Sequence, residues 1–316
     1  MGSRTAAGLV MAAAVLVALP AMAQETAKKG DATAATTAGG GAAPAAQPAA
    51  DEGAPAKRVT LTTGVDFVSA YMFRGLFQED SGVIMPPYVD VGVALYNGDG
   101  ALKNVTVNGG WWNSIHSGPS GSGNDSIERS AWYEADYYAS VTFTVGKWKP
   151  GALFTSYTSP NDAFKTVDEL AMVLAYDDSG TTFPLNPKAI VAFELKGQAD
   201  GGGGLEDGGS KGTYLELGVR PVVPLSAHST YPVTLAIPAK MGLSLNDYYQ
   251  GSSGSDTFGY FDLGGIVSVP LAFMNRGATW DLHGGLDILW LGENNKALNG
   301  GDGVKPVFTI GVGVVF

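Results

Sequence analysis

Two residues, Ser114 and His116, have the side chains that ester hydrolysis requires. They are two positions apart in a segment of alternating residues, so in an extended chain both side chains point to the same side. A serine hydroxyl becomes a nucleophile when a base such as histidine lies within hydrogen-bond reach. No longer motif of a known outer-membrane lipid hydrolase surrounds the pair. Lipid hydrolysis is therefore the alternative prediction, and the preferred one assigns no catalytic residue.

A second polar group, Asp281, His283 and Asp287, lies on one face of another alternating segment. Such side chains can bind a metal ion or transfer protons, but they also fit the polar lining of a barrel. The chain contains no cysteine, which excludes thiolate metal sites and disulfides. No phosphate-binding loop, dinucleotide fingerprint or zinc-ligand spacing is present. We therefore predict a protein that is not an enzyme and binds no cofactor or metal.

The first part of the chain predicts export. Residues 1–23 contain an early charge at Arg4, a short apolar run and the small-x-small sequence Ala21-Met22-Ala23, which is typical of a signal peptide cleaved after Ala23. Residues 24–57 are rich in Ala, Gly, Pro and Thr and predict a disordered tether. The formal charge of −11 argues against nucleic acid as a partner.

Residues 58–316 predict a single all-β domain. Apolar residues such as Val141 and Phe143 alternate with polar ones such as Ser140 and Thr142, which indicates strands with one apolar and one polar face. Pro86 and Pro87 predict an irregular stretch in the second strand. The twelve expected strands cover residues 59–74, 83–96, 102–114, 130–145, 148–158, 167–177, 188–197, 212–222, 232–245, 258–270, 278–291 and 304–316.

The connections between these strands predict a closed antiparallel transmembrane β-barrel. Long connections rich in Gly, Ser, Asn and Asp largely alternate with short ones, as in outer-membrane barrels. A soluble secreted β-sandwich is the structural alternative. The chain ends on Phe316 after alternating apolar residues, so we expect the last strand to pair with the first and Phe316 to be read by the outer-membrane insertion machinery. The predicted location is the bacterial outer membrane, in contact with its lipid and lipopolysaccharide.

The first two strands resemble a known family. The segment "GVDFVSAYMFRGLFQEDSGVIMPPYVDVGVAL", near residues 64–95, contains Val68, Ser69, Tyr71, Phe73, Arg74 and Gly75 in the order V-S-x-Y-x-F-R-G. This order is similar to the opening strand of the TorF-type family of outer-membrane porins. The resemblance is local and implies a barrel fold and an outer-membrane location more than a substrate.

The strand pattern assigns an acidic inner face to the barrel. Ten acids face five bases if Lys305 is included, so a hydrated lumen would favour cations. Twelve strands lie between barrels that side chains fill and barrels that hold an open channel, so a narrow passage and a lumen filled by paired charges both remain open. We predict a passive channel for small solutes, with no expectation about oligomeric state. The predicted pore-lining residues are Asp66, Arg74, Asp90, Glu134, Asp136, Glu169, Glu194, Lys196, Glu216, Arg220, Lys240, Asp262, Asp281, His283 and Asp287.

Overall fold

The computed structural model describes residues 58–122, 130–197, 211–226, 232–251, 254–274 and 277–316. The predicted signal peptide and tether lie outside these ranges. Strands make up nearly all of the regular structure that is described, as the sequence predicts. No described helix is both long enough and apolar enough to cross a membrane.

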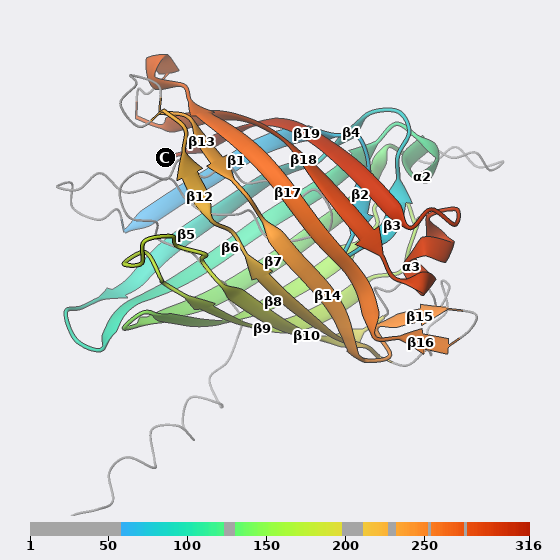
Figure 1. Ribbon diagram of the computed structural model, residues 1–316, viewed down its shortest axis with the longest axis horizontal. Coiled ribbons are helices and arrows are strands. Elements are labelled where there is room, and N and C mark those ends of the chain that lie inside the picture. Colours follow the sequence, from blue (N-terminus) through green and yellow to red (C-terminus); the bar gives the residue numbers. More distant parts are fainter. Residues whose placement is uncertain (1–57, 123–129, 198–210, 227–231, 252–253, 275–276) are drawn as a thin grey trace, which may run out of the picture.

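Twelve antiparallel wall strands form one closed barrel (Figure 1). Three of the twelve are divided into two shorter elements. In chain order they are β1 (Val59–Val68), β4 (Ile84–Met85) with β5 (Pro87–Asn97), β6 (Leu102–His116), β7 (Trp132–Val145), β8 (Trp148–Thr158), β9 (Val167–Tyr176), β10 (Lys188–Lys196), β11 (Thr213–Val219) with β12 (Val222–Pro224), β13 (Thr234–Ala236) with β14 (Ala239–Asn246), β17 (Phe258–Pro270), β18 (Thr279–Leu291) and β19 (Val304–Val315).

The last strand closes the barrel against the first. β19 pairs with β18 on one side and with β1 on the other, from Thr62 opposite Val315 to Val68 opposite Thr309. The Phe316 amide also donates a hydrogen bond to the Leu61 carbonyl at 2.9 Å. The predicted closure is therefore confirmed, and the alternative of a β-sandwich is wrong because one sheet closes on itself.

Proline divides the three interrupted strands. Pro86 separates β4 from β5, Pro221 lies between β11 and β12, and Pro238 lies between β13 and β14. A proline cannot donate a hydrogen bond to a ladder, so regular pairing stops at each position. The irregularity expected in the second strand is confirmed.

The first wall strand is shorter than predicted. It ends at Val68 rather than residue 74, and the chain then forms a separate hairpin of β2 (Tyr71–Phe73) and β3 (Leu76–Glu79). Tyr71 and Phe73, which continue the alternation of β1, are buried rather than exposed. We call residues 70–79 the inner hairpin.

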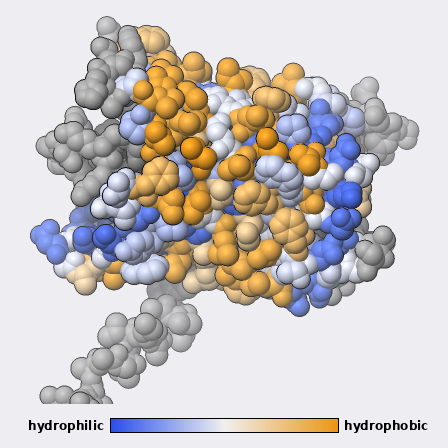
Figure 2. Space-filling view, in the orientation of Figure 1, coloured by the Kyte–Doolittle hydropathy of each residue, from blue (hydrophilic) through white to orange (hydrophobic). Residues whose placement is uncertain are grey.

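The two faces of the wall differ in chemistry. Outward side chains such as Phe67, Tyr137 and Ile310 are about half exposed, whereas inward neighbours such as Asp66 and Asp136 are buried. Figure 2 shows apolar side chains gathered over the middle of the wall, with hydrophilic ones at its right-hand end. A wall that is apolar outside and polar inside is the pattern of a membrane barrel.

The two ends of the barrel also differ. The inner hairpin, α2 (Pro119–Ser122), the hairpin of β15 (Tyr249–Gly251) with β16 (Gly254–Asp256), and α3 (Glu293–Leu298) lie together at one end, which we call the loop end (Figure 1). The carboxyl terminus and the short turn between β5 and β6 lie at the opposite end, which we call the turn end, together with η1 (Ala272–Met274).

Candidate functional site: the lumen and the inner hairpin

Most of the predicted pore-lining residues are placed on the inner side of the wall strands. The buried ones are Asp66, Asp90, Glu134, Asp136, Glu169, Glu194, Asp262, His283 and Asp287, and the half-buried ones are Glu216, Arg220, Lys240 and Asp281. Lys196 differs because a register shift after Glu194 places it opposite Asp168, where it is exposed. Strict alternation fails at such a bulge, since one extra residue changes the face.

Arg74 occupies the lumen in a way that the sequence did not predict. It lies in the turn of the inner hairpin rather than on β1. Its guanidinium forms a two-pronged ion pair with Glu169 on β9, with Nη1–Oε2 and Nη2–Oε1 distances of 2.6 Å each. Nη1 also donates to the Tyr248 hydroxyl at 2.7 Å. The arginine therefore connects the hairpin to the far wall of the lumen.

Aromatic rings surround this ion pair. The Arg74 guanidinium lies 4.2 Å from the centre of the Tyr214 ring, 5.3 Å from that of Phe73 and 5.5 Å from that of Tyr248. Tyr157 approaches the same Glu169 carboxylate at 3.4 Å. We call Glu169, Tyr157, Tyr214 and Tyr248 the arginine cage.

The backbone of the hairpin turn fits the cage closely. Arg74 and Gly75 both have positive φ angles, of 48° and 80°, and only glycine adopts this region readily. A Cβ atom at Gly75 would lie 2.8 Å from Asn295 Nδ2 and from Tyr260 Cβ. The Tyr249 hydroxyl donates to the Arg74 carbonyl at 3.0 Å. The turn is thus held from both sides by loop-end elements.

The electrostatics of the cage keep Arg74 charged. Burial alone would lower the pKa of the Arg74 guanidinium, but the adjacent Glu169 carboxylate outweighs it and raises the pKa well above its ordinary value. Burial raises the pKa of the Tyr248 phenol well above its ordinary value. Tyr248 therefore stays protonated, and its oxygen accepts the hydrogen bond from Arg74.

The second predicted pair, Ser114 and His116, is brought together beside the inner hairpin. Ser114 Oγ lies 2.6 Å from His116 Nε2, and His116 Nδ1 lies 2.5 Å from Ser120 Oγ. The Ser120 amide donates to Glu79 Oε2 at 2.8 Å. A nucleophile beside a base is the start of a hydrolytic site, but here a serine, not a carboxylate, contacts the second ring nitrogen of the base. Ser114 and His116 are also both fully buried. They pack under Tyr71 and Tyr133, whose ring is stacked on His116 at 4.4 Å.

A third cluster joins the strands at the barrel seam. His283 on β18 contacts Asp66 on β1 at 2.8 Å through Nε2 and Asp281 at 2.9 Å through Nδ1. The contact with Asp66 passes over Gly311 on β19, which lies opposite both Asp66 and His283. Asp287, predicted on the same face, is not part of the cluster and lies opposite Gly264 on β17. Among the described residues, no group of acids and histidines has the arrangement of a metal site.

Several buried polar atoms on the inner wall have no protein partner. They include Asp136 Oδ1, Ser140 Oγ and Thr142 Oγ1 on β7, and Asp262 Oδ1 and Asp287 Oδ2 on the opposite side. Polar atoms that are buried without a partner cost free energy unless water or a ligand pairs with them. These rows of atoms therefore favour a hydrated lumen between the inner hairpin and the turn end.

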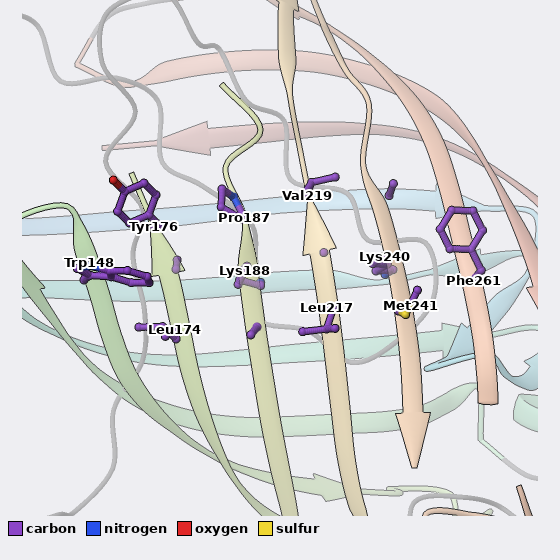
Figure 3. Close-up of a pocket in the computed structure, with 14 residues that line it drawn as sticks. Trp148, Leu174, Tyr176, Pro187, Lys188, Leu217, Val219, Lys240, Met241 and Phe261 are labelled. Carbon is purple, nitrogen blue, oxygen red and sulfur yellow. The ribbon is translucent and has the colours of Figure 1, made fainter. Parts of the chain in front are cut away.

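A groove of about 680 Å³ lies on the outer side of the wall, across β8 to β17 (Figure 3). It forms where the small outward residues Ala189 and Ala239 lie between larger ones such as Leu217 and Met241. Trp148 and Tyr176 pack together at one edge, with ring centres 4.7 Å apart. Its mainly apolar lining suits lipid chains rather than an aqueous solute.

Comparison with known proteins finds no matching family model and no matching curated protein. Solved structures of similar fold include the NanC porin, with 12% identity, a TM-score of 0.38 and coverage of 80% of this chain and 98% of that one. The translocator domain of the autotransporter NalP from Neisseria meningitidis has 13% identity and a TM-score of 0.40, covering 83% and 89%. The β domain of the Bordetella autotransporter BrkA has 9% identity and a TM-score of 0.35, covering 82% and 98%.

The sequence missed several residues of these clusters. Glu79, Ser120, Tyr248 and Tyr249 belong to the segments that connect wall strands. In these segments no regular period relates a residue to the inner or outer face. Tyr248 and Tyr249 are adjacent aromatic residues within a polar loop. Two large aromatic residues are unusual in such a loop, and this was the signal that could have indicated their burial.

Proposed function

We propose that the protein is an outer-membrane β-barrel that passes small solutes through its lumen and prefers cations. The observation that carries this proposal is the closed barrel whose outer face is apolar and whose inner face is lined by acids. A water-containing passage lined by one sign of charge concentrates ions of the opposite sign. The resemblance of residues 64–95 to the TorF-type porins also supports it.

The wall of β5, β6 and β7 contributes most of the uncompensated charge. Its inner face contains Asp90, Glu134 and Asp136. The only lysine or arginine in the three strands is Lys103, which is exposed near the turn end. On other walls, acids have basic neighbours, as in the 3.4 Å pair of Lys240 and Asp262. Permeating cations therefore follow the β5–β7 side of the lumen.

The test is the reversal potential in planar bilayers under a KCl gradient. We expect cation preference in the wild type and a marked loss in the double variant Asp90→Asn with Asp136→Asn. The control, Asp99→Asn with Asp302→Asn, removes the same charge from exposed connections and should leave the potential unchanged. Because the Debye length falls from about 10 Å at 0.1 M salt to about 3 Å at 1 M, the preference should fade with salt. Anion preference in the wild type would refute the proposal.

The proposed location has a separate test. Export with cleavage after Ala23, insertion through Phe316 and contact with lipid and lipopolysaccharide predict recovery in the outer-membrane fraction. The purified protein should migrate differently on gels before and after heating. A protein that stays in the periplasm without detergent would contradict this location.

A lipid hydrolase is the second candidate, because Ser114 and His116 are within hydrogen-bond distance. Purified protein incubated with phospholipid and lipopolysaccharide distinguishes the two functions. The channel proposal predicts no ester release, since the serine is fully buried. Ester release that His116→Ala abolishes would favour the hydrolase.

A further inference from the structure

The arginine cage has the geometry of a binding site for a planar cation. The two carboxylate oxygens of Glu169 each accept one hydrogen bond of 2.6 Å from a different guanidinium nitrogen. The Tyr214 ring lies under the guanidinium carbon at 4.2 Å, and the Tyr248 hydroxyl accepts a third hydrogen bond. A carboxylate that accepts two parallel hydrogen bonds, beside an aromatic ring that stacks on the cation, favours a planar guanidinium. It favours an ammonium less, because an ammonium is a compact point charge.

The occupant of the cage belongs to a segment that is not hydrogen-bonded into the ladders of the wall. β2 and β3 form a two-stranded sheet of their own and share no ladder with any wall strand. The hairpin is positioned instead by side-chain contacts, such as those of Arg74 and of Tyr71 with Glu134 at 2.8 Å. Arg74 also has a φ of 48°, a conformation that costs free energy for a residue other than glycine. The cage therefore stabilises the position of Arg74 against its backbone preference.

The cage lies inside the barrel, towards its loop end. Its carboxylate comes from β9, one ring comes from β11, and Tyr248 precedes β15 at the loop end. Acids of the inner wall continue from the cage towards the turn end. A cation passing between the two ends would meet these groups, and Glu169 would attract it whenever Arg74 moved away.

We propose that the arginine cage is a recognition site for solutes that carry a guanidinium group, and that Arg74 is its tethered occupant. This inference rests on the proposed channel function and names the class of solute that the channel recognises. A free guanidinium displaces Arg74 from Glu169 and Tyr214 and makes the same contacts. Displacement releases the inner hairpin from the far wall at the same time.

The first test measures binding to the purified Arg74→Ala barrel in detergent micelles. Methylguanidine should bind at least about tenfold more tightly than methylamine, since only the former makes two parallel charge-assisted hydrogen bonds. Arg220→Ala, which removes an inward arginine near the turn end, is the control. It should bind methylguanidine more weakly than Arg74→Ala does, because Arg74 still occupies its cage. Equal binding of the two probes by Arg74→Ala would overturn the proposal.

The second test uses the wild-type channel and does not depend on the folding of Arg74→Ala. Agmatine and 1,5-diaminopentane carry similar charge on chains of similar length, but only agmatine has a guanidinium. We expect agmatine to block the potassium current at concentrations about tenfold lower, and Glu169→Gln to abolish the difference. Equal block by the two amines in the wild type would overturn the proposal.

The outcomes separate this inference from the channel function. A potassium current without discrimination between the amines refutes guanidinium recognition and leaves the channel in place. Guanidinium-selective binding by Arg74→Ala without any potassium current refutes the channel and leaves the binding site in place.

Discussion

Substitution of Gly311 tests whether the cluster at the barrel seam holds the closing strand. The bond between His283 Nε2 and Asp66 Oδ1 passes over Gly311, because the glycine lacks a side chain. A Cβ atom at Gly311 would lie 1.9 Å from Asp66 Oδ1 and 2.5 Å from His283 Nε2. Gly311→Ala therefore forces these two side chains apart.

The magnitude follows from two contributions. A hydrogen bond to a charged group contributes about 1.5–3 kcal/mol, and an extra carbon atom in a packed site costs about 1–3 kcal/mol. Asp66 and His283 can rotate away and relieve part of the overlap, so we expect Gly311→Ala to lower the free energy of unfolding by about 2–4 kcal/mol.

The assay is urea unfolding of the barrel in detergent, followed by the gel mobility of the unheated protein. Gly109→Ala is the matched control, because a Cβ atom at this exposed strand glycine meets nothing within 4 Å. Its effect should stay within about 0.5 kcal/mol. His283→Ala removes one of the two side chains that the new Cβ atom would meet. The double variant Gly311→Ala with His283→Ala should therefore lose less unfolding free energy than the sum of the two single losses. A wild-type midpoint for Gly311→Ala, or fully additive costs, would contradict this expectation.

Two further predictions concern the inner hairpin. Burial would raise the pKa of Glu79, but hydrogen bonds from Ser120 and Ser81 outweigh burial and lower it from 4.5. The Glu79 carboxylate therefore stabilises the folded protein above pH 4.5, and this stabilisation is lost as the pH falls through the lower pKa of the folded state. On acidification, the urea midpoint of Glu79→Gln should fall less than that of the wild type. Gly75→Ala would place a Cβ atom 2.8 Å from Tyr260 at a φ of 80°. We therefore expect the hairpin to leave the cage and the potassium conductance to rise. The control is Gly146→Ala, at a turn with a φ of 62° and no neighbour within 4 Å, which should not change the conductance.

The wall strands could be predicted because each one separates two environments. On β7, Tyr137 and Phe143 are exposed on the outer side, whereas Asp136 and Thr142 are buried on the inner side. This contrast gives a period of two that a single sequence contains in full. The same regularity placed most of the acids on the inner face, and it failed at Lys196, where the bulge has no signature in composition.

The inner hairpin could not be predicted from the same rule. Alternation continues through Tyr71 and Phe73, which suggested a strand extending to Arg74. An apolar ring is equally suited to lipid and to a dry aromatic cluster inside the barrel, so the pattern does not say which of the two it meets. The Glu169 partner of Arg74 is 95 residues away, and only the closed barrel brings the two together.

The structure also changes what the charge count means. The count of ten inward acids against five inward bases treats every charge as independent of its neighbours. In the structure, however, Arg74 is paired with Glu169, and Lys240 lies beside Asp262. In the part of the loop end that the structure describes, the buried Arg74 is therefore paired and surrounded by aromatic rings. The acidic excess extends along the wall from Asp136, which lies opposite the cage residue Tyr157, to Asp90. Under the proposed function, a cation that enters from the turn end is concentrated by these acids before it reaches the cage, where Glu169 is already paired with Arg74. The two proposals then divide the work: charge brings cations to the site, and a solute that matches the forked geometry of Arg74 replaces it there.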